Sequence, residues 1–198
     1  AGALASVTLL TSAAGGIFFG ALADKIGRAK ALVYSILVYS VFTALTATSR
    51  SLAELVLWRS LVGIGLGGEW SAGSVLVAET WPAEHRGKAI GLMQSGWAIG
   101  YILAALLAAA ILPTYGWRIL FVIGVLPAAL TLWIRKQVQE PKIWLERKNT
   151  MASSPRGGFF EMFRPPLLRK TFRAVLMTTR VLFAYWGLFA WMPAFLST

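Results

Sequence analysis

Apolar stretches long enough to cross a lipid bilayer recur along this chain, and they limit the folds that it can adopt. The hydrocarbon core of a bilayer is about 30 Å thick, so a helix needs roughly 20 mostly apolar residues to span it. The sequence therefore predicts an all-α fold, a polytopic transmembrane helical bundle. The six expected spans lie at about 4–22, 30–48, 55–79, 88–112, 117–135 and 174–196.

The composition excludes several other classes of protein. Hydrophobic residues make up 57% of the chain, charged residues only 14%, and cysteine is absent, so disulfide bonds and thiolate metal sites are excluded. With a single histidine as well, the sequence offers no nucleophile with its base and no set of metal ligands at one membrane depth. We expect no enzyme, no catalytic residue, no metal site and no cofactor. A channel is also disfavoured, because the spans hold isolated polar groups rather than a continuous polar stripe.

The net charge of +11 follows the expected topology. Most lysines and arginines lie in the breaks after the first, third and fifth spans, whereas the alternate breaks hold only Arg50 and Arg118. Basic short loops stay in the cytoplasm. We therefore expect a multi-pass protein of the plasma (cell inner) membrane, with its long basic stretch in the cytoplasm. The charge is explained by the lipid bilayer, and no nucleic-acid partner is expected.

The glycine run from Gly63 to Gly68 matches the G-x-G-x-x-G pattern of dinucleotide sites. No strand precedes it, and the pattern alone is weak evidence. Glycines four residues apart on one helix face let neighbouring backbones approach each other in lipid, so we expect a packing role instead. Such pairs are Gly63 with Gly67, Gly16 with Gly20, Gly87 with Gly91, and Gly96 with Gly100.

Packing alone does not explain Glu69, which lies slightly past the middle of the third span. An ionised carboxylate near mid-bilayer costs several kcal/mol unless it is paired or faces water, and intramembrane charges usually mark ion or substrate paths. Arg59 lies about 15 Å nearer the outside and about 80° around the helix axis, which lets both side chains border one cavity. Two interpretations stay open: Glu69 binds a proton or a polar substrate group, or it is a neutral, hydrogen-bonded packing acid.

Aromatic and polar side chains are expected near the same depth in neighbouring spans. Aromatic rings with polar tips suit an amphipathic organic solute, because they supply both an apolar wall and hydrogen bonds. The alternative for any single tryptophan is an interfacial anchor or a lipid-facing side chain. The candidates for the substrate or proton pathway, besides Arg59 and Glu69, are Trp70, Gln94, Trp97, Tyr101, Tyr185 and Trp186.

Charged residues also gather at the expected cytoplasmic ends of the spans. Asp24 ends the first span and Arg28 follows four residues later, the spacing of a local ion pair on a helix. Glu79 closes the third span and Arg86 opens the fourth. We expect these charges to latch the inner ends of neighbouring helices while the cavity faces outward. The alternative is that they are merely solvated loop charges.

The sequence around these charges resembles the signature motifs of the major facilitator superfamily. Residues 20–30, GALADKIGRAK, are similar to its G-x-x-x-D-[RK]-x-G-[RK]-[RK] signature between the second and third helices. Residues 59–65, RSLVGIG, look like the fourth-helix R-x-x-x-G-x-G motif. Residues 79–87, ETWPAEHRG, resemble the joint that follows, and residues 140–145, EPKIWL, resemble the segment that opens the central loop. The resemblance covers essentially the whole chain.

This resemblance implies a bundle of the major facilitator type, a monomer in which two six-helix halves give alternating access to one site. The chain begins without methionine, directly in apolar sequence, and we expect a fragment that holds the second to seventh helices. Residues 1–136 are then the N-terminal bundle without its first helix, 137–173 the basic cytoplasmic central loop, and 174–198 the first helix of the C-terminal bundle. The resemblance assigns the gate and signature motif to Gly20, Asp24, Lys25, Gly27, Arg28, Glu79, Arg86 and Gly87.

Departures from the motifs indicate which branch of the superfamily the chain resembles most. Ala29 stands at a usually basic position, and residues 140–145 lack the serine of the sugar-porter segment, which weakens a sugar-porter assignment. The fourth span has no proline at the place of the antiporter motif G-x-x-x-G-P-x-x-G-G, which favours symport. The run GLGGEWSAG followed by VAETWP is most similar to the metabolite and sialate-type proton symporters.

We therefore expect a secondary active transporter that moves a small organic solute, a carboxylic acid or a sialic-acid-like metabolite, by proton symport. Its partners are then the small-molecule substrate, protons and the lipid bilayer. Two alternatives stay open. One is a sugar porter or uniporter of the same superfamily, and the other is a non-transporting membrane solute sensor of the same fold.

Overall fold

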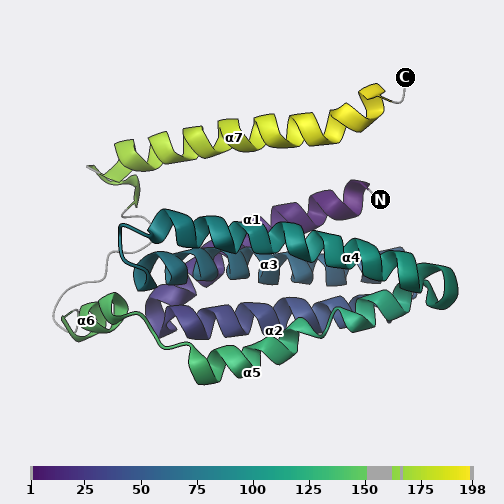
Figure 1. Ribbon diagram of the computed structural model, residues 1–198, viewed down its shortest axis with the longest axis horizontal. Helices are drawn as coiled ribbons and strands as arrows, with labels where there is room; N and C mark the ends of the chain where they lie inside the picture. Colours follow the sequence, from purple (N-terminus) through teal and green to yellow (C-terminus); the bar gives the residue numbers. More distant parts are fainter. Residues whose placement is uncertain (1, 151–161, 166, 197–198) are drawn as a thin grey trace. The chain divides into compact units, whose positions relative to one another are not determined.

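The computed structural model describes residues 2–150, 162–165 and 167–196, and the chain forms two compact units, residues 1–153 and 154–198. The two units are described separately. The first contains α1 (Gly2–Ile26), α2 (Arg28–Thr46), α3 (Leu52–Thr80), α4 (Arg86–Ile123), α5 (Pro127–Gln137) and α6 (Lys142–Thr150) (Figure 1). The second contains α7 (Leu167–Leu196).

The described elements are all helices, and several of them are of membrane length, which confirms the predicted all-α fold class. Within the described residues, four segments are long and apolar enough to cross a membrane: Ala3–Ile26, Arg28–Thr46, Leu52–Thr80 and Arg86–Thr131. The last of these holds most of two predicted spans, 88–112 and 117–135. The predicted span at 174–196 falls within α7, which begins earlier, at Leu167.

α3 is the central helix of the first unit and packs against both α1 and α2. It lies close to α1 because glycines remove the side chains between the two backbones. A Cβ added at Gly67 would overlap the Ser12 carbonyl oxygen, and one added at Gly63 would overlap the Thr8 carbonyl oxygen. Gly16 lies directly against the Gly67 carbonyl. The predicted packing role is confirmed for these three glycines.

α4 includes the turn between the fourth and fifth predicted spans. Gly116 has φ 73° and ψ 176° there, a backbone conformation that a side chain disfavours, and the chain reverses direction (Figure 1). Pro113 lies one turn earlier. The non-helical Gly116 therefore divides α4 into two helical parts, which correspond to the two predicted spans. Within the described residues, a Cβ added at any of four glycines of α4 meets nothing within 4 Å: Gly87, Gly91, Gly96 and Gly100.

Pro127 separates the end of α4 from α5. A proline has no backbone N–H, so the helical hydrogen bond to Ile123 is lost and the chain makes two tight turns instead. In these turns Val125 N–H donates to the Val122 carbonyl at 3.1 Å, and Leu126 N–H donates to the Ile123 carbonyl at 2.9 Å. The predicted fifth span is thus continuous in direction but interrupted at residues 124–126.

The segment that follows Gly116 packs against α2. α5 contacts α2, and Gly124 lies against the Thr43 side chain. At the turn that ends α2, Arg118 Nη2 donates a hydrogen bond to the Ser49 carbonyl at 3.2 Å, and its guanidinium lies 4.4 Å from the Trp117 ring centroid. These contacts hold the end of α4 and all of α5 on the side of α2.

Local capping signals set the ends of α3. The Ser51 hydroxyl accepts a hydrogen bond from the Glu54 N–H at 3.2 Å, and the Glu54 carboxylate accepts one from the Arg50 N–H at 2.8 Å. This reciprocal S-x-x-E arrangement resembles a capping box. Trp81, extended before Pro82, ends the helix. These contacts and Pro82 therefore determine where α3 begins and ends.

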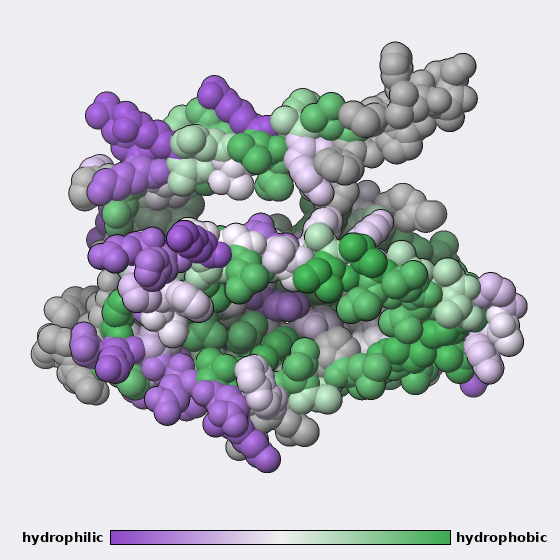
Figure 2. Space-filling view, in the orientation of Figure 1, coloured by the Kyte–Doolittle hydropathy of each residue, from purple (hydrophilic) through white to green (hydrophobic). Residues whose placement is uncertain are grey.

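The surface of the first unit separates into polar and apolar regions. Hydrophilic side chains gather at the end that carries the α1–α2 turn, the α3–α4 turn and α6, while apolar side chains cover the flanks of the helices (Figure 2). Ala89 is the one buried side chain among the described residues of α4, and Leu103 and Leu106 are exposed. Helices that satisfy their own backbone hydrogen bonds can expose such surfaces to lipid.

Replacing Gly67 by alanine is expected to push α1 away from α3, because the new methyl group would overlap the Ser12 backbone. Overpacking of this kind costs about 1–3 kcal/mol, and the melting temperature of the purified protein should fall. Gly73→Ala is the matched control on the same helix, since its Cβ would lie 3.7 Å from Leu32, an ordinary contact. Equal melting temperatures for the two variants would contradict the close packing of α1 and α3.

Candidate functional site

Arg28, the first residue of α2, is the centre of a buried network of ion pairs, which we call the Arg28 network. Its Nε donates to Glu79 Oε2 at 2.9 Å and its Nη2 donates to Glu79 Oε1 at 3.1 Å, a two-point contact. Its Nη1 lies 2.9 Å from Asp24 Oδ1 and also donates to the Ala23 carbonyl oxygen at 2.9 Å. One guanidinium group therefore joins the end of α1, the start of α2 and the end of α3.

The two carboxylates bound to Arg28 differ in exposure. The Glu79 side chain is 16% exposed and that of Asp24 is 73% exposed, whereas that of Arg28 is only 6% exposed. A solvent-exposed ion pair contributes little to stability, but removal of one partner from a buried pair leaves an uncompensated charge. The predicted pair of Asp24 and Arg28 is confirmed, and the pair of Arg28 and Glu79 is the more important one.

Glu140, from the segment after α5, caps the N-terminus of α2. Its carboxylate accepts hydrogen bonds from the backbone N–H groups of Arg28 at 2.7 Å, Ala29 at 3.2 Å and Lys30 at 3.2 Å. These groups have no partner inside the helix, and a negative charge at a helix N-terminus is stabilising. Gly27 is required beside them, because its φ is 116° and a Cβ would overlap the Glu140 carboxylate.

Trp144, at the start of α6, packs at the same place. Its side chain is buried, and its indole Nε1 donates a hydrogen bond to the Asp24 carbonyl oxygen at 3.2 Å. The Lys148 ammonium lies 5.1 Å from the centroid of the Trp144 ring, a cation–π contact one turn along α6. The chain from Glu140 to Lys148 therefore packs against the Arg28 network.

The other predicted gate residues surround this network. Lys25 is exposed, and Gly20 is half-buried near Ser71. Arg86 opens α4, and its Nε is buried without a hydrogen-bond partner among the described residues. Gly87, the next residue, is exposed. The structure thus pairs Glu79 with Arg28, on the neighbouring helix, and shows no pair of Glu79 with Arg86 in the described part of the chain.

Glu69 lies on the side of α3 that faces α2. One turn before it, Gly65 lets the α2 backbone approach so closely that an added Cβ would be 2.7 Å from the Tyr39 Cβ. Glu69 follows Gly65 by four residues, so the half-buried Glu69 and the half-buried Tyr39 belong to the facing sides of two membrane-length helices.

Arg59 is half-buried two to three turns earlier on α3. Its guanidinium lies 5.9 Å from the centroid of the Phe121 ring, on the part of α4 that follows the turn. Its carbonyl oxygen accepts a hydrogen bond from the Thr8 hydroxyl of α1 at 3.2 Å. Among the described residues no ion pair joins Arg59 to Glu69. The two charges on α3 therefore have different neighbours.

Three of the predicted pathway residues share one face of α4. Gln94, Trp97 and Tyr101 are spaced by three and four residues, and all are exposed. The Trp97 and Tyr101 ring centroids are 5.8 Å apart with their planes tilted by 32°. Trp70 on α3 is 53% exposed. The aromatic candidates of α3 and α4 are therefore surface side chains of the first unit.

The remaining pathway candidates belong to α7. Tyr185 is 39% exposed within the second unit, and the side chain of Trp186 lies outside the part of the chain that the structure describes. Both residues belong to the second unit, whereas Glu69 belongs to the first.

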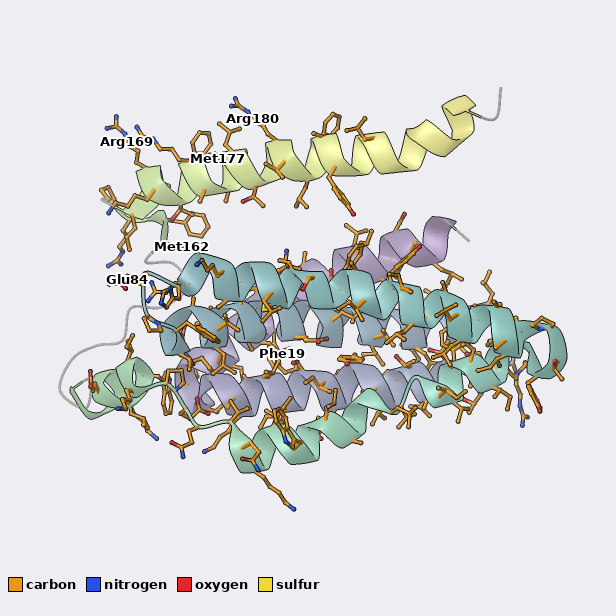
Figure 3. The ribbon with its side chains drawn as sticks, in the orientation of Figure 1. Phe19, Glu84, Met162, Arg169, Met177 and Arg180 are labelled. Atoms are coloured by element: carbon orange, nitrogen blue, oxygen red, sulfur yellow. The ribbon has the colours of Figure 1, made fainter. Side chains whose placement is uncertain are left out.

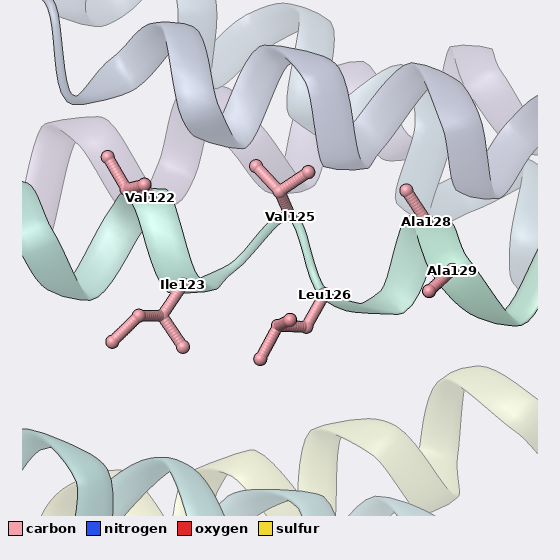
Figure 4. Close-up of a pocket in the computed structure, with 6 residues that line it drawn as sticks. All are labelled: Val122, Ile123, Val125, Leu126, Ala128 and Ala129. Atoms are coloured by element: carbon pink, nitrogen blue, oxygen red, sulfur yellow. The ribbon is translucent and has the colours of Figure 1, made fainter.

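An apolar hollow of about 420 Å³ lies where α4 gives way to α5. Figure 4 shows Ile123 and Leu126 pointing to one side of the chain, and Val122 and Val125 to the other. The lining is completed by Ala128 and Ala129. Because no lining side chain is polar, this hollow cannot orient a polar solute, and we assign no solute site to it.

Glu140, Trp144 and Tyr39 make contacts that were not predicted from the sequence. For Glu140 a signal was available: α2 begins after a glycine, and none of the usual capping side chains precedes it, so its N-terminus needs a partner from elsewhere. For Tyr39 the signal was its position near the middle of the second predicted span. The antiparallel third span brings Glu69 to a similar depth.

A bundle of membrane-length helices, with buried charges at one end and isolated charges between the helices, is typical of polytopic transporters. The chain belongs to the Major Facilitator Superfamily, whose family profile matches residues 1–198. The predicted family is therefore confirmed.

Known relatives agree with this assignment. The chain is 35% identical to the sialic acid transporter NanX of Escherichia coli, over 98% of this chain and 47% of that protein. It is 33% identical to the cis,cis-muconate transport protein of Acinetobacter baylyi, over 100% of this chain and 49% of that protein. The chain spans about half the length of the curated relatives it matches.

A solved structure shows the same fold. The inward-open xylose transporter XylE from E. coli matches with a TM-score of 0.65 and 22% sequence identity. The match covers 91% of this chain and 45% of that chain. The helical arrangement of the chain is therefore that of a major facilitator.

Glu79→Gln is expected to destabilise the protein far more than Asp24→Asn does. The first change leaves the buried Arg28 guanidinium without its main partner, at a cost of about 3 kcal/mol or more. The second removes an exposed partner, at a cost below about 1 kcal/mol. Thermal unfolding of the two purified variants measures the difference, and equal losses would show that the Arg28–Glu79 contact is not the dominant one.

Proposed function

We propose that this chain is the N-terminal part of a secondary active transporter that moves a small carboxylic acid, such as a sialic-acid-like metabolite, by proton symport. The observation that carries the proposal is the half-buried Glu69 carboxyl group of a membrane-length helix, on the side that packs against Tyr39 of α2. The family supplies the activity, and the names of two relatives, for sialic acid and cis,cis-muconate, support an acidic solute.

Glu69 is suited to carry the proton because its neutral and its ionised form are stable in different surroundings. The neutral acid is compatible with an apolar layer, whereas the carboxylate needs water or a hydrogen-bond donor. A phenol can donate a hydrogen bond to the carboxylate and accept one from the acid, so Tyr39 can serve both states. In this scheme Glu69 takes up a proton when the site is open to the outside and releases it towards the cytoplasm.

Arg59 is the proposed attractor for the anionic group of the solute. It lies nearer the outer side than Glu69 in the expected orientation, and the ring of Phe121 provides a partner for its guanidinium when no anion is present. The aromatic and polar side chains of α3, α4 and α7 then contact the body of the solute: Trp70, Gln94, Trp97, Tyr101, Tyr185 and Trp186.

The Arg28 network is the proposed cytoplasmic gate. It holds the inner ends of α1, α2 and α3 together, with Glu140 and Trp144 joining the central loop to the same point. A solute can shift the equilibrium between two states only by its difference in affinity for them. The exposed ion pair of Asp24 with Arg28 costs little free energy to break, so a modest difference in solute affinity between the two states is enough to open it.

The topology and the division of the chain are part of the same proposal. The excess of Lys and Arg in alternate loops supports a location in the cell inner membrane with the central loop in the cytoplasm. Residues 1–136 then belong to the N-terminal bundle, 137–173 to the central loop, and 174–198 to the C-terminal bundle. We further propose a monomer without metal or cofactor.

Proton symport is tested in proteoliposomes that hold the complete transporter and an internal pH dye. Addition of sialic acid, lactate, an aromatic acid or a neutral sugar should acidify the interior with one acid only. Glu69→Gln should abolish this acidification, because the amide cannot carry the proton. Glu54→Gln is the matched control, since Glu54 is an exposed carboxylate at the other end of the same helix.

Each other outcome points to a different function. Solute uptake without a pH change, or coupling that survives Glu69→Gln, would remove Glu69 from the proton path. Uptake of the sugar alone would favour the sugar porter or uniporter. Binding of a solute without any flux would favour the non-transporting sensor.

A further inference from the structure

Three arginines of α7, which we call the arginine row, lie along one face of that helix: Arg169, Arg173 and Arg180. Arg173 and Arg180 lie within about 40° of Arg169 around the helix axis. Figure 3 shows Arg169 and Arg180 leaving α7 on the same side. All three are exposed within the second unit. By helical rise Arg180 lies about 10 Å beyond Arg173, inside the predicted span.

The arginine row has no acidic partner on its own helix. α7 contains no Asp or Glu, and neither do the other described residues of the second unit. A charge at this depth is costly unless it reaches an anion or water. Helical side chains lean towards the helix N-terminus, so the long Arg180 side chain can extend back towards Arg173 and the membrane surface.

On α7, the arginine row lies on a different face from Tyr185, the side chain proposed to contact the solute. Tyr185 follows Arg180 by five residues, which places it about 140° away around the helix axis. If Tyr185 faces the solute path, the arginine row faces away from it. Exposed apolar side chains instead border the row, on the side opposite to Lys170: Phe172, Leu176 and Phe183.

We propose that the arginine row binds the headgroup of an anionic phospholipid in the cytoplasmic leaflet. A guanidinium offers parallel N–H donors that match the oxygens of a phosphate group. The bordering apolar side chains are placed to contact the acyl chains of the same lipid. Charge complementarity and the adjoining apolar face together select an amphipathic anion over a water-soluble one. The leaflet follows from the proposed orientation, in which α7 begins at the cytoplasmic side.

Native mass spectrometry of the complete transporter with added phosphatidylglycerol or phosphatidylcholine tests this proposal. We expect a preference for phosphatidylglycerol, and the double variant Arg173→Gln/Arg180→Gln should bind it roughly tenfold or more weakly. Lys136→Gln/Lys170→Gln is the matched control, because it removes the same charge at exposed residues off the row and should keep the wild-type affinity. Arg173→Lys/Arg180→Lys retains the charge but not the parallel N–H donors, so it should bind phosphatidylglycerol more weakly than the wild type and more tightly than the glutamine variant.

Two results would overturn the proposal. One is an equal affinity for phosphatidylglycerol in the glutamine variant and its control. The other is an unchanged lipid affinity together with a raised KM for the solute, which would place the arginine row on the solute path. Lipid binding is measured without transport, so its outcome does not depend on whether Glu69 carries a proton.

Discussion

The buried guanidinium of Arg28 is the constraint around which one end of the first unit is built. A positive charge that is only 6% exposed requires negative partners, and Glu79 and Asp24 reach it from two other helix ends. The start of α2 adds its unpaired N–H groups at the same point, and Glu140 satisfies them. The positions of α1, α2, α3 and the segment that carries Glu140 therefore depend on one another through a single residue.

The first unit contains two kinds of contact: rigid packing between helices, and polar contacts that can be broken. α1 and α3 meet through glycines, and their backbones are so close that an added side chain at these glycines would overlap the neighbouring helix. At the end that carries Arg28, the contacts are hydrogen bonds and ion pairs of graded exposure, which water or a competing charge can replace. In the proposed alternating-access mechanism, the rigid contacts keep the helices together as one body and the polar contacts form the joint that opens.

The apolar spans, the family and the Asp24–Arg28 pair could be predicted from the sequence, because length, hydropathy and local spacing determine them. The partner of Glu79 could not, since Arg86 is closer along the chain and only the packing of α2 on α3 brings Arg28 to it. Glu140 lies more than a hundred residues from the helix that it caps. The neighbours of Arg59 and Glu69 likewise depend on helix rotation, which residue spacing on α3 alone does not give.

The most direct test of the gate is a distance measurement across the cytoplasmic side of the complete transporter. Because this chain has no cysteine, spin labels can be attached at Lys30→Cys and Leu168→Cys, both exposed positions of the two units. The account predicts that Glu79→Gln shifts the distances to longer values, towards the inward-open form. The exposed Glu84→Gln in the next loop should leave them unchanged. Identical distance distributions for the two variants would contradict a gate built on Arg28.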